Sequence, residues 1–212
     1  MATTKRPGLP YVWVTWLTKI LAGEGQCLYQ PWLKAHFRYD KRPDTTFNLA
    51  AWTTEHDALV QTRAAELRLE GWVVTLERQN AFQLFGKSAI LAGQPDIVAV
   101  RPGETLVVDG KTGQQRHSDL WQVLVYMVVL PRCRESLTNI RGEVCYKSHR
   151  VPVEREELTP ARAEAIYKLL RTIAGERLAT TPSQKECGFC DVADCADRFV
   201  ESEAGRAMAT EF

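Results

Sequence analysis

The sequence predicts an α/β fold in which a central mixed sheet is flanked by helices. Short runs of β-branched and aromatic residues alternate with longer segments whose apolar residues recur at helical spacing. An alternation of this kind is typical of a sheet covered by helices. The chain has 212 residues, 45% of them hydrophobic, which is enough to build a core. We therefore expect one domain, or one domain with an appendage.

The first half of the chain is predicted to contain two helices followed by two strands. In the second helix, Val60, Ala64 and Leu67 share one apolar face, and Gly71 follows as a C-terminal cap. Short β-rich runs come next, and they are bounded by polar residues and glycine. In chain order we expect helices at 14–21 and 57–70 and strands at 73–76 and 82–85.

The second half begins with a predicted hairpin, because Pro102-Gly103 separates two strand-like runs. A helix follows in which Trp121 starts an apolar stripe at helical spacing. A later helix has Thr159 as its N-cap and Pro160 at its first position. In chain order we expect strands at 97–101 and 106–108, a helix at 118–130, strands at 143–146 and 151–153, a helix from Pro160, and a helical or frayed tail at 201–212.

Two acids and a lysine accompany the predicted hairpin. Asp96 precedes its first strand and Asp109 closes its second, so both carboxylates are expected at one edge of the sheet. Converging carboxylates repel one another unless a divalent cation lies between them, and oxygen ligands suit Mg²⁺ or Mn²⁺. Lys111, on the same strand face, could orient or deprotonate a water, or neutralise charge on a phosphate. Each half of this pattern is, alone, also common at surface turns.

The helix after the hairpin carries two polar residues that could complete such a site. Gln122 and Tyr126 are four residues apart and project from one face of the helix. An amide and a phenol at this place could hold a phosphate, or could hold Lys111. Taken as an isolated pair, they are more consistent with ordinary, partly buried polar residues.

Together, Pro95-Asp96, Asp109-Gly110-Lys111 and Gln122-x-x-x-Tyr126 resemble the PD-(D/E)XK nuclease superfamily and, within it, the RecB-like branch. The resemblance implies a restriction-endonuclease-like core that hydrolyses phosphodiester bonds with divalent metal. It also implies a metal-binding histidine upstream of the first acid. His56, which would open the predicted helix at 57–70, matches this position. By resemblance, the catalytic residues are Asp96, Asp109, Lys111, Gln122 and Tyr126, and the metal ligands are His56, Asp96, Asp109 and Gly110 through its carbonyl.

The cysteines form the second strong pattern. Cys187-x-x-Cys190 and Cys195 lie in a stretch rich in Gly, Asp and Ala, which cannot form a core without a cross-link. Ligation of zinc or of an iron–sulfur cluster would supply one, with Cys27 as the best fourth ligand. A redox-active dithiol is a third interpretation. Disulfides are a poorer one, because the sequence shows no export signal. The two other cysteines, Cys133 and Cys145, are expected to be packing residues.

One cysteine before the core and three after it resemble the CRISPR-associated RecB-like iron–sulfur exonucleases, from about Trp16 to about Cys195. The resemblance implies a 4Fe-4S cluster held in a small lobe that both chain ends form. It divides the chain into an N-terminal helical segment (1–50), a nuclease core (51–180) and a cysteine cluster with tail (181–212). Three features depart from the family: Asp109 replaces a more usual glutamate, Cys27 lacks the following proline and arginine, and the gap from Cys190 to Cys195 is short.

The family also implies DNA that is single-stranded or carries overhangs, pre-spacer processing in CRISPR adaptation, and CRISPR integrase proteins as partners. A phage or DNA-repair exonuclease of the same branch would have a similar sequence. A non-catalytic adaptor that binds DNA ends through the cysteine lobe is an alternative from another class. We expect a cytoplasmic protein, because the longest apolar-rich stretch, 120–130, is too short to cross a bilayer.

The net charge of +1 argues against broad electrostatic binding of nucleic acid. A local basic and aromatic run is nevertheless suited to phosphate contacts and base stacking. It is equally consistent with a solvated face whose aromatic residues belong to a core. The run contains Trp32, Lys34, His36, Phe37, Arg38, Tyr39, Lys41 and Arg42. A second basic group, Lys111, Arg116 and His117, would lie against the substrate backbone.

Overall fold

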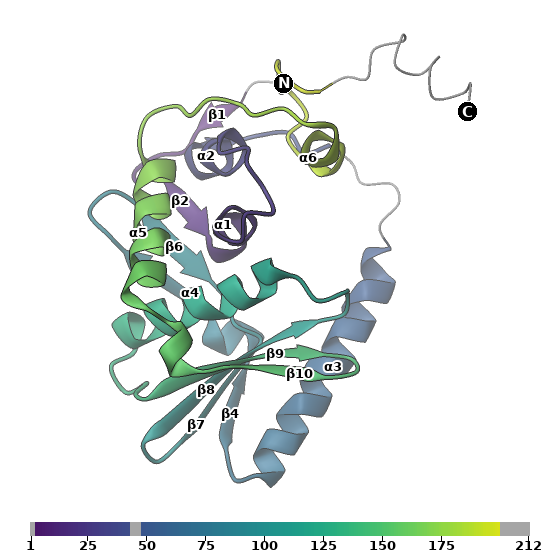
Figure 1. Cartoon of the computed structure of the whole chain (residues 1–212), viewed down its shortest axis with the longest axis vertical. Coiled ribbons are helices and arrows are strands. Elements are labelled where there is room, and N and C mark those ends of the chain that lie inside the picture. Colours follow the sequence, from purple (N-terminus) through teal and green to yellow (C-terminus); the bar gives the residue numbers. More distant parts are fainter. Residues whose placement is uncertain (1–2, 43–47, 200–212) are drawn as a thin grey trace.

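The computed structural model describes residues 3–42 and 48–199. The predicted tail at 201–212 lies outside them. Figure 1 shows helices on both sides of a twisted sheet. In chain order the helices and strands are β1 (Thr4–Lys5), β2 (Tyr11–Trp13), α1 (Val14–Leu21), α2 (Tyr29–His36), β3 (Phe37–Arg38), α3 (Leu49–Leu69), β4 (Val73–Leu76), β5 (Phe82–Phe85), β6 (Ile90–Gly93), β7 (Ile97–Arg101), β8 (Glu104–Lys111), α4 (His117–Cys133), β9 (Ile140–Tyr146), β10 (Arg150–Val153), α5 (Pro160–Ala174) and α6 (Gln184–Phe189).

The main sheet is mixed, as predicted. Within the described residues it has five strands in the order β10-β9-β8-β7-β4. Only its β8–β9 pair is parallel, because α4 carries the chain back between these strands. The β7–β8 hairpin pairs Ile97 with Val108. This register places positions 96 and 109 at the same end of the two strands.

Helices cover both faces of the main sheet. On one face, α3 packs Val60, Ala64 and Leu67 into a cluster with residues of β7 and β8. On the other face, α4 is buried on nearly every side, since α1 and α5 cover the surface that it turns away from the sheet. A Cβ at Gly142 would lie 2.1 Å from Val123 Cγ1, so glycine at this position allows α4 to approach β9 closely.

A buried ion pair fixes α3 on the sheet. Arg63 donates from Nε and Nη2 to the two carboxylate oxygens of Glu143 on β9, at 2.7 and 3.0 Å. Both side chains are almost wholly buried. Nη1 of Arg63 also donates to Glu66 and Glu70. Burial alone would lower the pKa of the guanidinium, but these carboxylates more than compensate, so its pKa is raised.

The predicted start of the helix at 57–70 was wrong. The helix α3 begins at Leu49, where the Asn48 side chain caps it by accepting from Ala51 N at 3.0 Å. The first turns are mostly exposed, and the buried face of the helix begins only at Val60. His56 therefore lies inside the helix, not at its opening. The C-terminal end agrees with the prediction, since Gly71 follows with a φ of +86°.

Most other predicted elements are confirmed, some with longer bounds. Strands β4, β5, β7 and β10 and the helix α1 match closely, whereas β8 continues through Asp109 to Lys111 and β9 begins at Ile140. Sequence reasoning missed α2, α6, the short strands β1 and β3, and the strands β2 and β6. The last two form, with β5, a three-stranded sheet in the described part of the chain. None of the described helices is long and apolar enough to span a membrane.

The two ends of the described chain pack together. Trp32 and Leu33 of α2 form a small buried cluster with Val192, far away in sequence. Backbone hydrogen bonds add to this packing, including one from Arg42 N to the Asp191 carbonyl at 2.8 Å. Figure 1 shows α2 and α6 on the same side of the molecule, above α1. The divisions expected at residues 50 and 180 stay predictions.

Candidate active site

The acid that precedes β7 is held in place by a buried asparagine. Asn80 is fully buried, and its Nδ2 donates to the carbonyls of Pro95 (3.2 Å) and Asp96 (3.4 Å). Its Oδ1 accepts from Thr75 Oγ1 at 2.6 Å. The Asp96 backbone therefore cannot shift without breaking buried hydrogen bonds. Sequence reasoning missed Asn80, because a polar residue between two strands looks like ordinary turn chemistry.

The carboxylate of Asp96 connects α3 to β8. Its Oδ2 lies 3.2 Å from His56 Nε2 and accepts a hydrogen bond from Gly110 N at 2.7 Å. The hydrogen bond with Asp96 raises the pKa of His56, against the effect of burial. A Cβ at Gly110 would lie 3.5 Å from both Asp96 Oδ2 and His56 Nε2, so the glycine leaves room beside these groups.

Asp109 points to the other side of β8, toward α4. Its carboxylate is buried, with Oδ2 2.7 Å from Lys111 Nζ, and Oδ1 accepts from Gln122 Nε2 at 2.7 Å. Lys111 Nζ also donates to Gln122 Oε1 at 2.9 Å. The amide of Gln122 donates further to Tyr126 Oη at 3.2 Å, and that hydroxyl donates to the Gln94 carbonyl at 3.4 Å. One buried glutamine thus fixes both the acid and the lysine.

The charges in this cluster are partly unbalanced. Burial raises the pKa of Asp109 to about 6; the negative charge of Asp96 acts in the same direction and Lys111 opposes it. The pKa of Lys111 is also raised, since its attraction to Asp109 outweighs the effect of burial. Two carboxylates of like charge, an imidazole and a backbone carbonyl form a donor set that suits a hard divalent cation.

The structure brings some predicted metal ligands into contact and not others. His56, Asp96 and Gly110 meet, whereas Asp109 pairs with Lys111 and Gln122. In the ranges that the structure describes, no group of three or more His, Cys, Asp or Glu side chains is arranged to hold a metal ion. The four-ligand site therefore stays a prediction, as do the catalytic roles.

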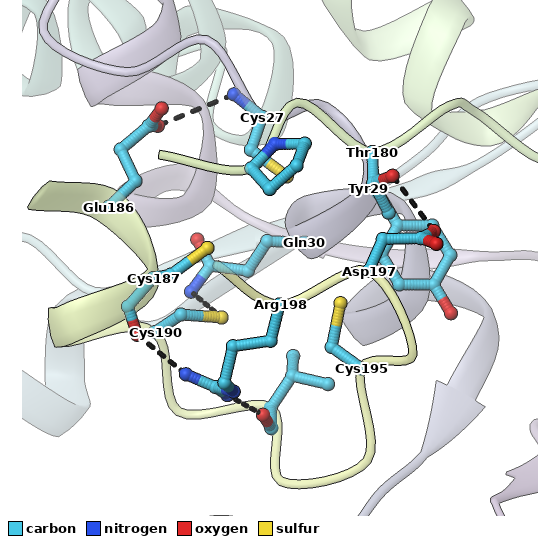
Figure 2. Close-up of a pocket in the computed structure, with 12 residues that line it drawn as sticks. Cys27, Tyr29, Gln30, Thr180, Glu186, Cys187, Cys190, Cys195, Asp197 and Arg198 are labelled. Atoms are coloured by element: carbon cyan, nitrogen blue, oxygen red, sulfur yellow. Dashed lines mark hydrogen bonds between the residues drawn. The ribbon is translucent and has the colours of Figure 1, made fainter. Parts of the chain in front are cut away.

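The four cysteines expected to act together line one pocket between the chain ends (Figure 2). The sulfurs of Cys187, Cys190 and Cys195, on the C-terminal segment, point into the space between this segment and the N-terminal one. Cys27 approaches the same space from the N-terminal segment. Two sulfurs accept hydrogen bonds, Cys190 Sγ from Gln30 Nε2 at 3.4 Å and Cys187 Sγ from the Phe199 backbone at 3.3 Å. Burial raises the pKa of the Cys190 thiol.

None of the chain's six cysteines forms a disulfide, and all six lie in described segments. Cys145 is buried in the cluster under α3, and Cys133 packs against the main core. The expectation that these two are packing residues is therefore confirmed.

The loop before α2 links the cysteine pocket to the helix α4. Glu186 Oε1 accepts from the backbone N–H groups of Gln26 (2.9 Å) and Cys27 (3.3 Å). In the same loop, Glu24 Oε1 accepts from Ser118 N at 3.1 Å and so satisfies a free N–H in the first turn of α4. Sequence reasoning missed both carboxylates, because their partners lie far away along the chain.

The basic and aromatic run was interpreted either as a nucleic-acid contact or as a solvated face whose aromatic residues belong to a core. The structure favours the solvated face. Trp32 is buried, and Tyr39 and Phe37 pack against it in the small cluster of the chain ends. Tyr39 Oη donates to Asp191 Oδ2 at 2.7 Å, and Lys34 Nζ lies 2.7 Å from Asp191 Oδ1. The base-stacking interpretation of this run was therefore wrong, because its aromatic residues form the core that joins the ends.

Two of the other histidines have structural contacts and lie outside the candidate site. His36 Nε2 lies 2.9 Å from the Ile173 carbonyl and stacks on Trp32, which gives it a structural place. His149 stacks on Tyr146 at 4.7 Å between ring centroids. Among these histidines, only His56 contacts an acid of the candidate site. The imidazole of His56 also stacks on the indole of Trp52, with 5.0 Å between the ring centroids. Sequence reasoning missed this contact.

Comparisons with known proteins identify a family. No curated protein matches the chain. A solved structure titled "Crystal structure of SSO0001" is 12% identical, covers 92% of this chain and 90% of that chain, and has a TM-score of 0.44. The sequence model of one family, described as the PD-(D/E)XK nuclease superfamily, matches residues 22–195. This match spans most of the chain and every candidate residue above, so the protein belongs to the PD-(D/E)XK nuclease superfamily.

Proposed function

We propose that this protein is a divalent-metal-dependent deoxyribonuclease that removes nucleotides from DNA with single-stranded character. Members of its superfamily are typically metal-dependent nucleases. The observation that carries the proposal is the hydrogen-bonded cluster of Asp109, Lys111 and Gln122 on one face of β8, beside the His56–Asp96 contact at the same strand end.

The metal ligands would be His56, Asp96, Asp109 and the carbonyl of Gly110. When bound, the ion supplies polarisation of the phosphate and a lower pKa for the attacking water. Lys111 then acts at the reacting phosphate. Its ammonium, kept charged by Asp109, orients the water or stabilises negative charge as the phosphorus centre becomes five-coordinate.

Gln122 and Tyr126 act as positioning residues in this scheme. The carbonyl of Gln122 accepts from Lys111, and its two N–H groups serve Asp109 and Tyr126, so no polar atom of the amide is left over. Because the side chain is buried on α4, it holds Lys111 at a fixed place relative to Asp109.

We further propose that Cys27, Cys187, Cys190 and Cys195 hold a 4Fe-4S cluster. Free thiols around one pocket and N–H donors to two sulfurs support this. These four cysteines would hold the cluster, and it would supply the cross-link that ties the two chain ends together.

Pre-spacer processing with CRISPR integrase proteins is the biological role that we propose. Its support is the combination of the nuclease core with the one-plus-three cysteine pattern. A phage or DNA-repair exonuclease of the same branch would share both features. Neighbouring genes, and the proteins that co-purify with the chain, distinguish these roles.

The nuclease proposal is tested by digestion of end-labelled single-stranded and duplex DNA by anaerobically purified protein. We expect cleavage with Mn²⁺ or Mg²⁺, none with chelator, and a loss of at least about 100-fold in Lys111→Ala. Lys87→Ala, which removes an exposed lysine between β5 and β6, serves as the control and keeps full activity. Absence of cleavage by folded wild-type protein on every substrate contradicts the proposal.

The cluster proposal has its own measurement, independent of nuclease activity. Anaerobically purified protein should be brown and contain about four irons and four sulfides per chain. Cys187→Ser should lose both, whereas Cys133→Ser should keep them because Cys133 lies outside the pocket. Stoichiometric zinc in place of iron contradicts the assignment.

A non-catalytic adaptor is the second candidate, and one observation favours it. The carboxylate of Asp109 faces Lys111 and Gln122 and does not meet the His56–Asp96 contact, and its Oδ2, 2.7 Å from Lys111 Nζ, accepts no hydrogen bond within the described residues. An adaptor would bind DNA ends equally well after Lys111→Ala and would lose binding after Cys187→Ser. The nuclease proposal instead expects that digestion is lost after Lys111→Ala.

A further inference from the structure

A buried hydrogen bond that has no part in the mechanism above joins the first turn of α4 to the end of β9. Tyr146 Oη donates to Asp119 Oδ2 at 2.8 Å, and the two residues are only 5% and 8% exposed. Burial and the bond to Asp119 raise the pKa of Tyr146, so the phenol keeps its proton and remains the donor. Asp119 Oδ2 also accepts from Arg116 N at 3.0 Å, which closes the start of the helix.

This bond lies beside the lysine of the candidate site. In the parallel pairing of β8 with β9, Lys111 and Tyr146 are partners. Val144 and Tyr146 pack in the core with α4, whereas Cys145 between them packs on the α3 side. Asp109 on β8 also meets α4, and Lys111, two residues further along, lies on the same strand face. Tyr146 and Lys111 are therefore neighbours on the face of the sheet that α4 covers.

On the helix, the acceptor of this bond is close to the glutamine that holds the site together. Asp119 and Gln122 are three residues apart on α4, so both project from the same side, toward the sheet. Asp119 binds β9 and Gln122 binds Lys111 on β8, so two buried polar bridges tie α4 to neighbouring strands. The negative charge of Asp119 also reaches Lys111, because burial lowers the pKa of this lysine and Asp109 and Asp119 raise it.

The loop from β8 to α4, residues 112–116, is anchored at the same place. His149 Nε2 lies 3.0 Å from Gln115 Oε1, and the imidazole stacks on the ring of Tyr146 with 14° between the planes. The end of β9, the loop and the helix thus meet at Tyr146. A movement of the loop or of the first turn of α4 must break a contact that this tyrosine makes or supports.

We propose that Asp119 and Tyr146 are positioning residues that fix Lys111 for the reaction. The proposal rests on the proposed nuclease function and deepens it. Their bond holds the first turn of α4 against the strand ends, and Gln122, about one turn further along, holds Lys111 beside Asp109. Neither positioning residue touches the reacting phosphate. Misplacement of a catalytic group by about 1 Å can cost about 100-fold in rate, so such a bond affects the reaction from outside it.

The test measures single-turnover cleavage of an end-labelled single-stranded oligonucleotide by the anaerobically purified full chain with Mn²⁺. Tyr146→Phe removes one hydroxyl and should lower the rate constant about 10- to 100-fold. Binding of the same strand, measured by fluorescence anisotropy with Ca²⁺ to prevent turnover, should stay within about 3-fold of wild type. Misplacement of Lys111 predicts this separation of rate from affinity.

Substitutions of Asp119 separate the effect of position from that of charge. In Asp119→Asn the amide oxygen can still accept from Tyr146 and Arg116, so the cleavage rate should stay within about 5-fold of wild type. Asp119→Ala removes both bonds and should lose at least as much rate as Tyr146→Phe. Combined with Gln122→Ala, Tyr146→Phe should cause little further loss, because both changes release the same lysine.

Tyr39→Phe is the matched control, because it removes a hydrogen bond of the same kind in the cluster that joins the chain ends. There Tyr39 Oη donates to Asp191 Oδ2 at 2.7 Å. Both tyrosine variants should lower the melting temperature by about 2–4 °C, but Tyr39→Phe should keep the wild-type cleavage rate. Hydrogen exchange, measured by mass spectrometry, should increase in residues 112–116 and in the first turn of α4 only in Tyr146→Phe.

The outcomes separate this role from stability, from charge and from failure of the proposed function. An equal loss of rate in Tyr39→Phe overturns the proposal, because the effect would then follow from stability. Equal losses in Asp119→Asn and Asp119→Ala overturn it in favour of a role for the charge. Absence of cleavage by wild-type protein overturns the nuclease function and this inference with it, whereas normal wild-type cleavage with an unchanged rate in Tyr146→Phe overturns this inference alone.

Discussion

The ion pair between Arg63 and Glu143 allows the loss of stability in a variant to be estimated from the structure. Arg63→Ala removes two charge-assisted hydrogen bonds, of 2.7 and 3.0 Å, and leaves a buried carboxylate without its cation. At about 1.5–3 kcal/mol for each bond to a charged group, the loss is about 3–6 kcal/mol, in agreement with about 3–5 kcal/mol for breaking a buried pair. That is about a fifth or more of the roughly 5–15 kcal/mol that stabilises a domain.

Urea unfolding followed by circular dichroism at pH 7 measures this loss. With an m-value of about 2 kcal/mol/M, the midpoint for Arg63→Ala should fall by about 1.5–3 M. The double variant Arg63→Met with Glu143→Leu should recover most of the stability, since an apolar pair carries no desolvation cost. Arg171→Ala, which breaks an exposed pair with Glu164 on α5, should cost less than about 1 kcal/mol. Equal losses in Arg63→Ala and Arg171→Ala would refute the reasoning.

Three further predictions concern other elements. Gly142→Ala should destabilise by about 1–3 kcal/mol through the clash with Val123, and Val123→Ala should relieve it; additive losses in thermal unfolding would contradict this. Asn80→Ala should cost about 2 kcal/mol by leaving buried carbonyls before β7 unpaired, and a change below about 0.5 kcal/mol in the same assay would contradict it. Hydrogen bonds from Arg141 and Arg101 hold the pKa of Glu104 below its usual 4.5. The contribution of Glu104 to the free energy of unfolding is therefore complete above pH 4.5, and it is lost as the pH falls through the lower pKa of the folded state. Glu104→Gln should therefore lose less than about 1 kcal/mol at pH 7 and nothing at pH 2, and a difference that persists at pH 2 would count against the pairing.

The strands were the most predictable part of the fold. β4, β5 and β7 are short β-rich runs with polar or turn residues at their ends, and these local signals fix them closely. The start of α3 was missed although Asn48, Leu49 and Trp52 mark it, because the buried face that guided the prediction begins only at Val60. The helix α2 was missed for a related reason, since its apolar residues pack against the distant C-terminal segment.

The candidate site was also predictable where local sequence signals mark it. The short Pro102-Gly103 turn sets the hairpin register, so the proximity of positions 96 and 109 was predictable. The spacing of Gln122 and Tyr126 on one helix face was also readable, and the structure places Gln122 against Lys111. The supports of the site were not predictable. Asn80 and Glu24 act through hydrogen bonds to the backbone of other elements, and no periodic pattern marks such contacts.

The meeting of the two chain ends has a consequence for biosynthesis. Gln30 and Cys190, which touch across the pocket, are 160 residues apart. A ribosome adds about 5–20 residues per second, so the N-terminal side of the pocket waits roughly 10–30 s for its partner to be synthesised. The main sheet and the helices on it can pack during that interval, while the thiol of Cys27 stays without its companions. Closure of the pocket is therefore a late step, which requires that Cys187, Cys190 and Cys195 have been synthesised.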